Sequence, residues 1–270
     1  MPIELQHVVQ QIPEKEFYEL DYEIMRMAFD AHNDLGRFYD EIIYKNELDR
    51  RCGKAGIPST KEFEAKLIHK DFEKSLFLDL LVNGSSVYEL KAAKAIVEPN
   101  RAQALNYLFS TNTQNGKLIN FRPPSVEHEF VSTNLTHEKR KRFSIDDRDL
   151  ERGGNAYYIR EILVDLLNDW GAFFDTDIYL DALCHFLGGK ESIIRSVAIH
   201  SGNILLGQQP VPHLSDTEGF CITSLTKNIL LYKKHLIRFL KHTRFESMHW
   251  INFNHSKIHF SSLKRKSFCP

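Results

Sequence analysis

The sequence has no hydrophobic run long enough to cross a membrane, and it does not begin like a secretory leader. A membrane-spanning helix needs about 18 apolar residues in a row, and a leader needs a basic segment followed by an apolar one. Residues 1–16 are polar and acidic instead. These absences predict a cytoplasmic protein with no membrane partner.

Cysteine is scarce, and no two cysteines form a Cys-x-x-Cys pair. The four are Cys52, Cys184, Cys221 and Cys269. This spacing suggests neither a small disulfide framework nor a zinc knuckle, so we interpret the four as buried or incidental thiols.

The chain also lacks a strong net charge, which is -1 at pH 7. A polyanionic partner would therefore have to be held by local basic patches and not by the overall field. Candidate patches are Lys139–Arg142, Lys233 with Lys234, and Lys264–Lys266.

The sequence contains an internal repeat. Asp34–Leu48 reads DLGRFYDEIIYKNEL, and Asp169–Leu183 reads DWGAFFDTDIYLDAL, displaced by 135 positions (169 − 34). A second pair of segments, Gln103–Phe121 and His235–Phe253, ends in the same Ile-Asn-Phe with an offset of 132 (253 − 121). A period this long exceeds a solenoid unit and predicts two tandem domains.

The first copy has a recognisable order of elements. Helical periodicity covers about residues 18–33 and 39–52, and strand-like runs follow at 62–69, 75–82 and 86–92. A helix near 99–110 and strands at 117–121 and 126–132 complete the copy. The core order is α-β-β-β-α-β, which favours an α/β fold with a mixed sheet flanked by helices.

Three polar residues of this copy can meet at one point. Glu89 and Lys91 are two apart on one strand and project from the same face. A two-residue turn at Asn83-Gly84 would place Asp79 opposite Tyr88, whereas a three-residue turn or a bulge would place it opposite Glu89. Both turns are common, and we adopt the second because it makes chemical sense.

Two carboxylates at one point repel each other unless a cation lies between them. Oxygen ligands suit Mg²⁺ or Mn²⁺, which can polarise a phosphate and lower the pKa of a bound water. Lys91 would orient that water or offset the charge on the phosphate. Glu41, one helical turn before Tyr44, is a candidate third carboxylate.

The set Asp79...Glu89-x-Lys91 within this order of elements resembles the PD-(D/E)XK nuclease superfamily. Further motifs look like its GxxExxY branch over roughly Tyr18 to Ser132: Gly36...Glu41-x-x-Tyr44, Tyr88-Glu-Leu-Lys-Ala, Gln103-x-Leu-x-Tyr107 and Leu118-Ile-Asn-Phe121. One departure is Phe38, which stands where the second glycine of the branch would fall.

The resemblance implies a restriction-endonuclease-like, metal-dependent phosphodiesterase. Asp79 and Glu89 would bind metal with Glu41 in support, and Lys91 would be the catalytic base or the group that orients water. Gln103 and Tyr107 would contact the site or the substrate. We add the basic residues Lys139, Arg140, Lys141 and Arg142 as candidate substrate contacts.

The second copy lacks these groups while it keeps the packing residues. At the repeat offsets, Glu41 becomes Thr176, Gln103 becomes His235 and Tyr107 becomes Phe239. Thr223-Ser224-Leu225-Thr226 is aligned with Tyr-Glu-Leu-Lys, and no counterpart of Asp79 is found. We therefore expect only the first copy to carry a site.

The sequence thus predicts two tandem restriction-endonuclease-like domains that form an internal pseudo-dimer: residues 1–137 with the motif, a charged linker at 138–152, and a degenerate repeat at 153–270. The expected function is Mg²⁺-dependent cleavage of nucleic acid, with DNA favoured and RNA as the alternative. The competing hypothesis is an inactive module with the same fold that binds nucleic acid or a protein.

Overall fold

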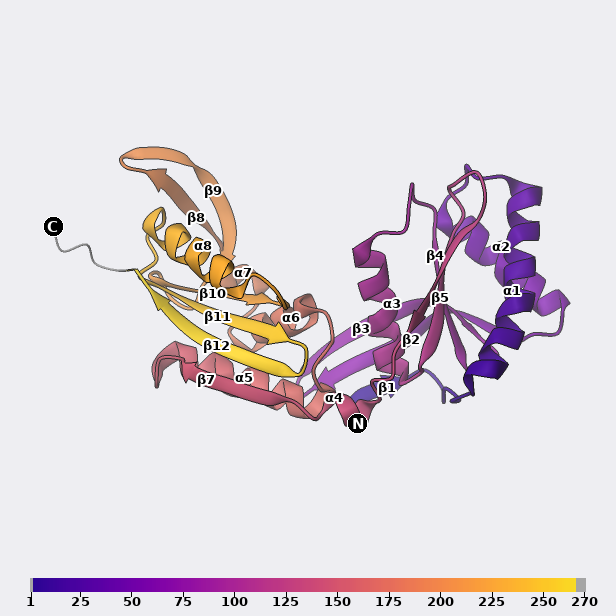
Figure 1. Cartoon of the computed structure of the whole chain (residues 1–270), viewed down its shortest axis with the longest axis horizontal. Coiled ribbons are helices and arrows are strands. Elements are labelled where there is room, and N and C mark those ends of the chain that lie inside the picture. The colour runs from indigo at the N-terminus through magenta and orange to yellow at the C-terminus, as the bar shows by residue number, and fades with distance from the viewer. Residues whose placement is uncertain (1, 266–270) are drawn as a thin grey trace. The chain divides into compact units, whose positions relative to one another are not determined.

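The structure is a computed structural model that describes residues 2–265, and the chain divides into two compact units, residues 1–139 and 140–270. Each unit combines helices with a mixed sheet (Figure 1). The predicted α/β class with mixed sheets is therefore confirmed. The two units are described separately.

The first unit is built on a six-stranded sheet ordered β1-β2-β3-β4-β5-β6. All neighbours are antiparallel except β4 and β5, which run parallel because helix α3 connects them. Its elements are β1 (Ile3–Leu5), α1 (Glu14–Leu35), α2 (Glu41–Lys54), β2 (Ser59–His69), β3 (Phe72–Val82), β4 (Ser86–Lys91), α3 (Glu98–Thr111), β5 (Asn115–Asn120) and β6 (Glu127–Ser132).

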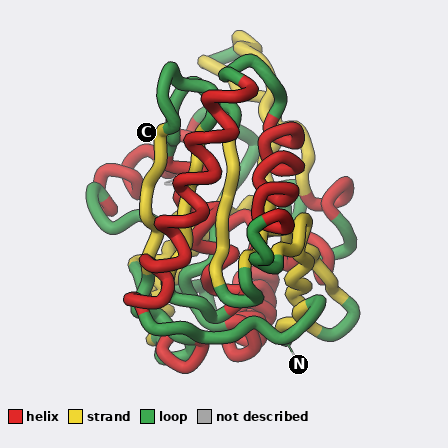
Figure 2. Tube along the Cα trace, turned by 90° about the vertical axis from the view of Figure 1, so that its right-hand side faces the viewer, coloured by secondary structure: helices red, strands yellow, loops and turns green. Residues whose placement is uncertain are grey.

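Helices cover both faces of this sheet. In α1, Ile24, Ala28 and Ala31 follow helical spacing and are fully buried, together with Tyr44 of α2, against one face. Figure 2 shows two helices lying across the near face of the strands. Helix α3 packs on the other face through Ala104 and Leu108. The predicted helices and strands are all present, and the short strand β1 is an addition.

The register of the β3–β4 hairpin decides between the two turns considered from the sequence. Leu80 pairs with Tyr88 and Val82 with Ser86, so the turn contains three residues, Asn83, Gly84 and Ser85. The register that places Asp79 level with Glu89 is confirmed. Asn83 and Gly84 have φ of 52° and 61°, left-handed values that Asn and Gly adopt readily.

Apart from the additional short helix α7, the second unit has the same order of helices and strands, but its sheet is smaller, ordered β10-β11-β12-β7, and the hairpin β8-β9 is separate. Its elements are β7 (Ser144–Asp149), α5 (Gly154–Trp170), α6 (Thr176–Phe186), α7 (Lys190–Ile193), β8 (Ile194–Ser201), β9 (Ile204–Pro212), β10 (Glu218–Thr223), α8 (Ile229–Lys241), β11 (Ser247–Asn254) and β12 (Lys257–Lys264). The strands on either side of α8, β10 and β11, are parallel. The strands on either side of α3 in the first unit, β4 and β5, are parallel too.

Repeated residues make the same contacts in both units. The Tyr44 hydroxyl donates to the Gly36 carbonyl at 2.7 Å, and the Tyr179 hydroxyl donates to the Gly171 carbonyl at 2.6 Å. Each tyrosine ring stacks on the phenylalanine of the Ile-Asn-Phe motif, at 4.4 Å for Phe121 and 4.9 Å for Phe253. The two units therefore share these two tyrosine contacts.

The segment expected to be a charged linker is largely structured. Helix α4 (His137–Arg140) runs across the boundary between the units, and β7 then pairs in parallel with β12. Asp146 on β7 forms an ion pair with Lys257 of β12 and lies 3.5 Å from Nδ1 of His259. A charged sequence of this kind is tolerated in a strand because β7 lies at the edge of its sheet.

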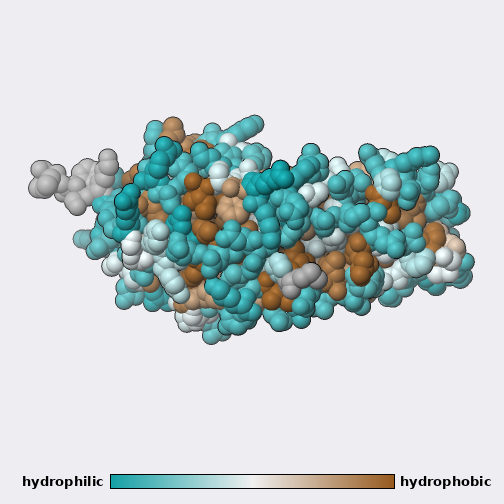
Figure 3. All heavy atoms as spheres, turned by 90° about the horizontal axis from the view of Figure 1, so that it is seen from below, coloured by the Kyte–Doolittle hydropathy of each residue, from teal (hydrophilic) through white to brown (hydrophobic). Residues whose placement is uncertain are grey.

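None of the described helices is both long and apolar enough to span a membrane. The face in Figure 3 is mainly hydrophilic, with apolar residues in small separate groups.

Replacing Tyr179 with phenylalanine should destabilise the second unit by about 1–2 kcal/mol, because the buried Gly171 carbonyl would lose its donor. Both tryptophans, Trp170 and Trp250, lie in this unit, so urea unfolding followed by tryptophan fluorescence reports on it. Tyr157→Phe is the control because Tyr157 is exposed. Equal unfolding midpoints for the two variants would contradict the assigned hydrogen bond.

Candidate active site

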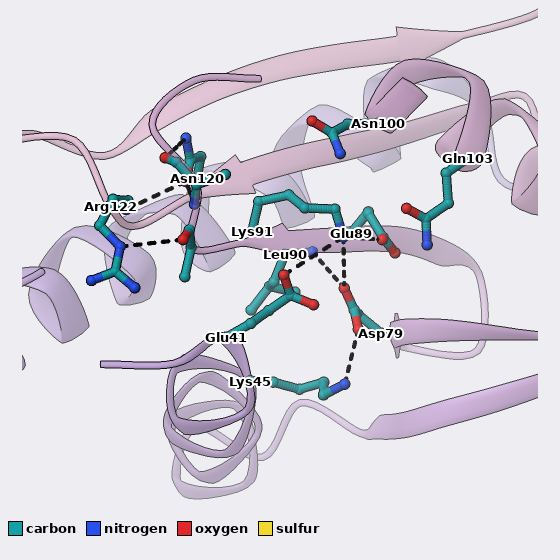
Figure 4. A network of polar contacts seen from close by, with 12 residues as sticks. Glu41, Lys45, Asp79, Glu89, Leu90, Lys91, Asn100, Gln103, Asn120 and Arg122 are labelled. Atoms are coloured by element: carbon teal, nitrogen blue, oxygen red, sulfur yellow. Dashed lines mark hydrogen bonds and ion pairs between the residues drawn. The ribbon is translucent and has the colours of Figure 1, made fainter. Parts of the chain in front are cut away.

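The site lies where β3 and β4 diverge. The backbone pairing of the two strands ends at Leu80 and Tyr88. At the next residue of β3, Asp79, the side chain and not the backbone bonds to β4. Asp79 Oδ2 accepts a hydrogen bond from the Leu90 amide at 2.8 Å (Figure 4). The carboxylate is thereby fixed between the two strands.

Glu89 and Lys91 come from the same face of β4 and meet Asp79. Lys91 Nζ donates to Glu89 Oε1 and lies 3.9 Å from Asp79 Oδ2. It also lies 3.7 Å from Glu41 Oε2, on α2. Three carboxylates therefore surround one ammonium group, and the structure brings all four residues together.

A second lysine, which was not predicted from the sequence, completes the cluster. Lys45 Nζ donates to Asp79 Oδ1 at 2.9 Å and also to Glu62 on β2. The Lys45 side chain is only 7% exposed. Lys45 stands four residues after Glu41, so the two share a face of α2; that spacing is the signal that could have found it.

Arg122 ties the segment before α2 to the end of β4. Its guanidinium donates to the carbonyls of Ala92, Arg37 and Tyr39 at 3.1–3.2 Å. Figure 4 shows Arg122 with Asn120 at one end of the network. We infer that this clamp positions Glu41 at the start of α2, and the residue was also missed by sequence reasoning.

The electrostatics of the cluster are dominated by the buried carboxyl of Glu89. Burial, and next the negative charge of Asp79, raise the pKa of Glu89 to about 8. Its Oε2 is buried and has no hydrogen-bond partner within residues 2–265. Burial opposes protonation of Lys91, but Glu89, Glu41 and Asp79 outweigh it and raise the pKa of Lys91, which keeps the ammonium charged.

These features fit a divalent cation. Carboxylate oxygens are the ligands that Mg²⁺ and Mn²⁺ prefer, and the unpartnered oxygen of Glu89 beside Asp79 is where added positive charge would lower the energy most. Among the described residues, no three Asp, Glu, His or Cys side chains are already gathered as a metal-binding group. The carboxylates converge on Lys91 instead.

The two residues predicted on α3 are hydrogen-bonded to each other. Gln103 Nε2 donates to the Tyr107 hydroxyl at 2.7 Å, and burial raises the pKa of Tyr107. In Figure 4 the Gln103 amide points toward the side of β4 that carries Glu89. Gln103 therefore borders the cluster, whereas Tyr107 is largely buried behind it.

The basic run Lys139–Arg142 does not form one exposed patch, contrary to the prediction. Arg140 is fully buried, donates to the Trp170 carbonyl at 2.6 Å and lies over the Phe174 ring. Burial lowers the pKa of Arg140 to about 10. Lys139 is exposed and donates to the Asn134 carbonyl, while Lys141 and Arg142 belong to the second unit. Arg140 is therefore a packing residue and not a substrate contact.

Cys52 and Cys184 are buried and Cys221 is half-buried, all as free thiols, which agrees with incidental cysteines. Cys269, and Lys266 of the predicted patch Lys264–Lys266, lie outside the described residues.

The strand register of the second unit corrects the sequence alignment there. Glu89 and Lys91 pair with Leu118 and Asn120, and the equivalent residues Trp250 and Asn252 pair with Cys221 and Thr223. The Glu89 and Lys91 positions are thus occupied by Cys221 and Thr223, not by Ser224 and Thr226. The sequence placed the motif three residues too late because the Gly- and Pro-rich stretch before β10 obscured the offset.

A side-chain clasp supports the corrected register. Asn120 bonds to both the amide and the carbonyl of Ala93, and Asn252 bonds to both the amide and the carbonyl of Leu225. The bridge between His213 and Gly219 then places the buried Val211 at the Asp79 position. Val211, Cys221 and Thr223 thus stand at the positions of Asp79, Glu89 and Lys91. None of the three carries the charge that a metal centre needs.

Residues 18–133 match the family model described as the PD-(D/E)XK nuclease superfamily. No curated protein and no solved structure matches the chain. The matched segment lies within the first unit and contains Glu41, Asp79, Glu89 and Lys91.

Metal affinity should depend on pH through Glu89. In the metal-free chain the pKa of Glu89 is raised from 4.5 to about 8, so a proton competes with metal throughout the range below pH 8. Mn²⁺ affinity should therefore rise about tenfold per pH unit from pH 6 to 8 and then level off. Calorimetric titration measures this, and Glu89→Gln should lose the affinity; a flat profile in the wild type would be inconsistent with Glu89 as a ligand.

Proposed function

We propose that the first unit is a divalent-metal-dependent nuclease, with DNA as the expected substrate and RNA as the alternative. The observation that carries the proposal is the convergence of Asp79, Glu89 and Glu41 on Lys91 at the end of the β3–β4 ladder. The superfamily match over residues 18–133 supports the same class of activity.

Asp79 and Glu89 are the proposed metal ligands, with Glu41 in support. A bound Mg²⁺ or Mn²⁺ would polarise the phosphate and lower the pKa of an attacking water. Lys45 and the Leu90 amide hold the Asp79 carboxylate in one orientation, so the ligand is positioned before metal arrives.

Lys91 acts in this proposal as a charged hydrogen-bond donor. The surrounding carboxylates keep its ammonium protonated, and an ammonium can orient water or offset the negative charge that develops on phosphate oxygens. Gln103, at the border of the cluster, is the proposed contact to the substrate, and Tyr107 holds its amide in place.

The inactive binding module would be favoured if Lys91 pointed away from the carboxylates. Lys91 instead donates to Glu89 and lies within 4 Å of Asp79 and Glu41, which favours the enzyme.

We also propose that the second unit is a degenerate copy of the first, and that the chain represents the GxxExxY branch. The shared tyrosine contacts and the Asn120 and Asn252 clasps support common descent of the two units. Val211, Cys221 and Thr223 at the key positions leave the second unit without a catalytic role.

Asp79→Ala and Glu89→Ala should abolish Mg²⁺-dependent cleavage of plasmid and single-stranded DNA, because each removes a proposed metal ligand. Lys91→Ala should lower the single-turnover rate by about 100-fold or more, since a charged donor is lost where charge develops. Gel-based assays with and without EDTA measure these rates.

Thr223→Ala and Cys221→Ala are the matched controls because they change the equivalent strand positions of the second unit, and both should cleave at the wild-type rate. Metal-dependent cleavage that persists in Asp79→Ala would show that the activity resides elsewhere.

A further inference from the structure

The strongest feature outside the candidate active site is a long stretch of the second unit without acidic residues. From Gly219 to Phe245 there is no Asp or Glu, and there are six basic residues: Lys227, Lys233, Lys234, Arg238, Lys241 and Arg244. The equivalent stretch of the first unit, Val87–Thr113, contains Lys91, Lys94 and Arg101 but also Glu89 and Glu98. The excess of positive charge is therefore particular to the unit that lost the catalytic residues.

Helix α8 presents this charge to solvent. Lys234, Arg238 and Lys241 are all exposed and lie at positions i, i+4 and i+7, so they form one stripe with about 4–6 Å of helix rise between neighbours. Within residues 2–265, neither Lys234 nor Arg238 has an ion-pair partner. On the flank of the stripe, Lys233 pairs with Asp149 at 3.3 Å.

The opposite side of α8 is the side that packs. Leu240 is the helix's one fully buried residue, and it joins Val197 and Val211 of the β8–β9 hairpin in a hydrophobic cluster that Leu236 and Phe239 border. The apolar side is thus in contact with protein, and the cations occupy the centre of the exposed side. The two exposed leucines of this helix, Leu230 and Leu231, lie in its first turn.

Basic residues continue past the end of α8 to Arg244, which pairs with Asp216 at 3.7 Å, and they border a hollow of about 430 Å³. Lys241, His242 and Arg244 line one side of it, and His200 and Gln208 of the hairpin line another. Figure 1 shows the hairpin beside α8, extending beyond the strands β10–β12. A helix and a two-stranded ribbon are the two elements that fit the major groove of duplex DNA.

We propose that α8 and the adjoining hollow of the second unit bind the phosphate backbone of duplex DNA. Duplex DNA carries one negative charge per about 1.7 Å of its axis, and the exposed cations of α8 are complementary to it, above all Lys234 and Arg238, which have no ion-pair partner among the described residues. The second unit would then supply affinity, while the first unit supplies chemistry. This inference rests on the proposed nuclease function for the choice of DNA as the polyanion.

The test uses the full-length chain with Asp79→Ala, so that DNA is bound but not cut. Adding Lys234→Ala and Arg238→Ala should weaken binding to a 30-base-pair duplex roughly 50-fold at 0.1 M salt. It should also reduce the slope of log affinity against log salt by about 1.8, which is about 0.9 for each phosphate contact. Alanine preserves the helix, and circular dichroism checks the fold.

The control carries Lys15→Ala and Arg26→Ala in the same background, because these exposed α1 residues give the same change of net charge. Equal affinity and slope in control and test variants would overturn the proposal. Binding to anionic phospholipid vesicles that depends on Lys234 and Arg238, without duplex binding, would overturn it in favour of a membrane surface.

The failure of this inference can be distinguished from the failure of the proposed function. In an otherwise wild-type chain, Lys234→Ala with Arg238→Ala should leave the single-turnover cleavage rate at saturating DNA unchanged. Absence of cleavage in the wild type, with the salt-dependent binding still lost in the variant, would refute the nuclease and keep the DNA-binding surface.

Discussion

The candidate site depends on the balance between buried carboxylates and two ammonium groups. Glu89 is 1% and Asp79 9% exposed at the side chain, and carboxylates this buried are costly unless positive charge lies close to them. Lys91 and Lys45 supply that charge from opposite sides, one from β4 and one from α2. The orientation of α2 against the sheet is therefore part of the chemistry, because it delivers both Glu41 and Lys45.

The second unit has contacts like those of the first without this cluster of charges. The clasp of Asn252 and the tyrosine contact of Tyr179 are neutral hydrogen bonds, and both have a counterpart in the first unit. The three positions that would carry charge are apolar or neutral. The packing of the fold and the chemistry of the site are thus largely separate sets of residues, joined only where α2 and β4 contribute to both.

The secondary structure and the carboxylate pair could be predicted because they depend on local patterns. Asp79, Glu89 and Lys91 stand out as polar residues among apolar strand residues, and the Asn-Gly turn marks the hairpin between them. The sequence narrows the register of β3 against β4 to two alternatives. It does not decide between them, because turns of two and of three residues are both favourable.

The remaining features depend on tertiary packing. In the sequence, Lys45 resembles an ordinary solvated helix lysine, and only the packing of α2 against β3 brings it to Asp79. Arg140 likewise belongs to a basic run in the sequence, but Trp170 and Phe174 cover it in the fold. The motif position in the second unit was misplaced because the pairing of β10 with β11, and not the sequence between them, sets the alignment.

The three-residue turn between β3 and β4 carries a consequence for how this chain can vary. Exposed turns ordinarily tolerate the loss or gain of a residue. Here a two-residue turn at Asn83-Gly84, in place of the three-residue one, would pair Val82 with Ser85, move Asp79 from the level of Glu89 to that of Tyr88, and reverse the face on which the side chains of β4 project. The length of this surface turn is therefore constrained as tightly as the identity of the acids that it aligns.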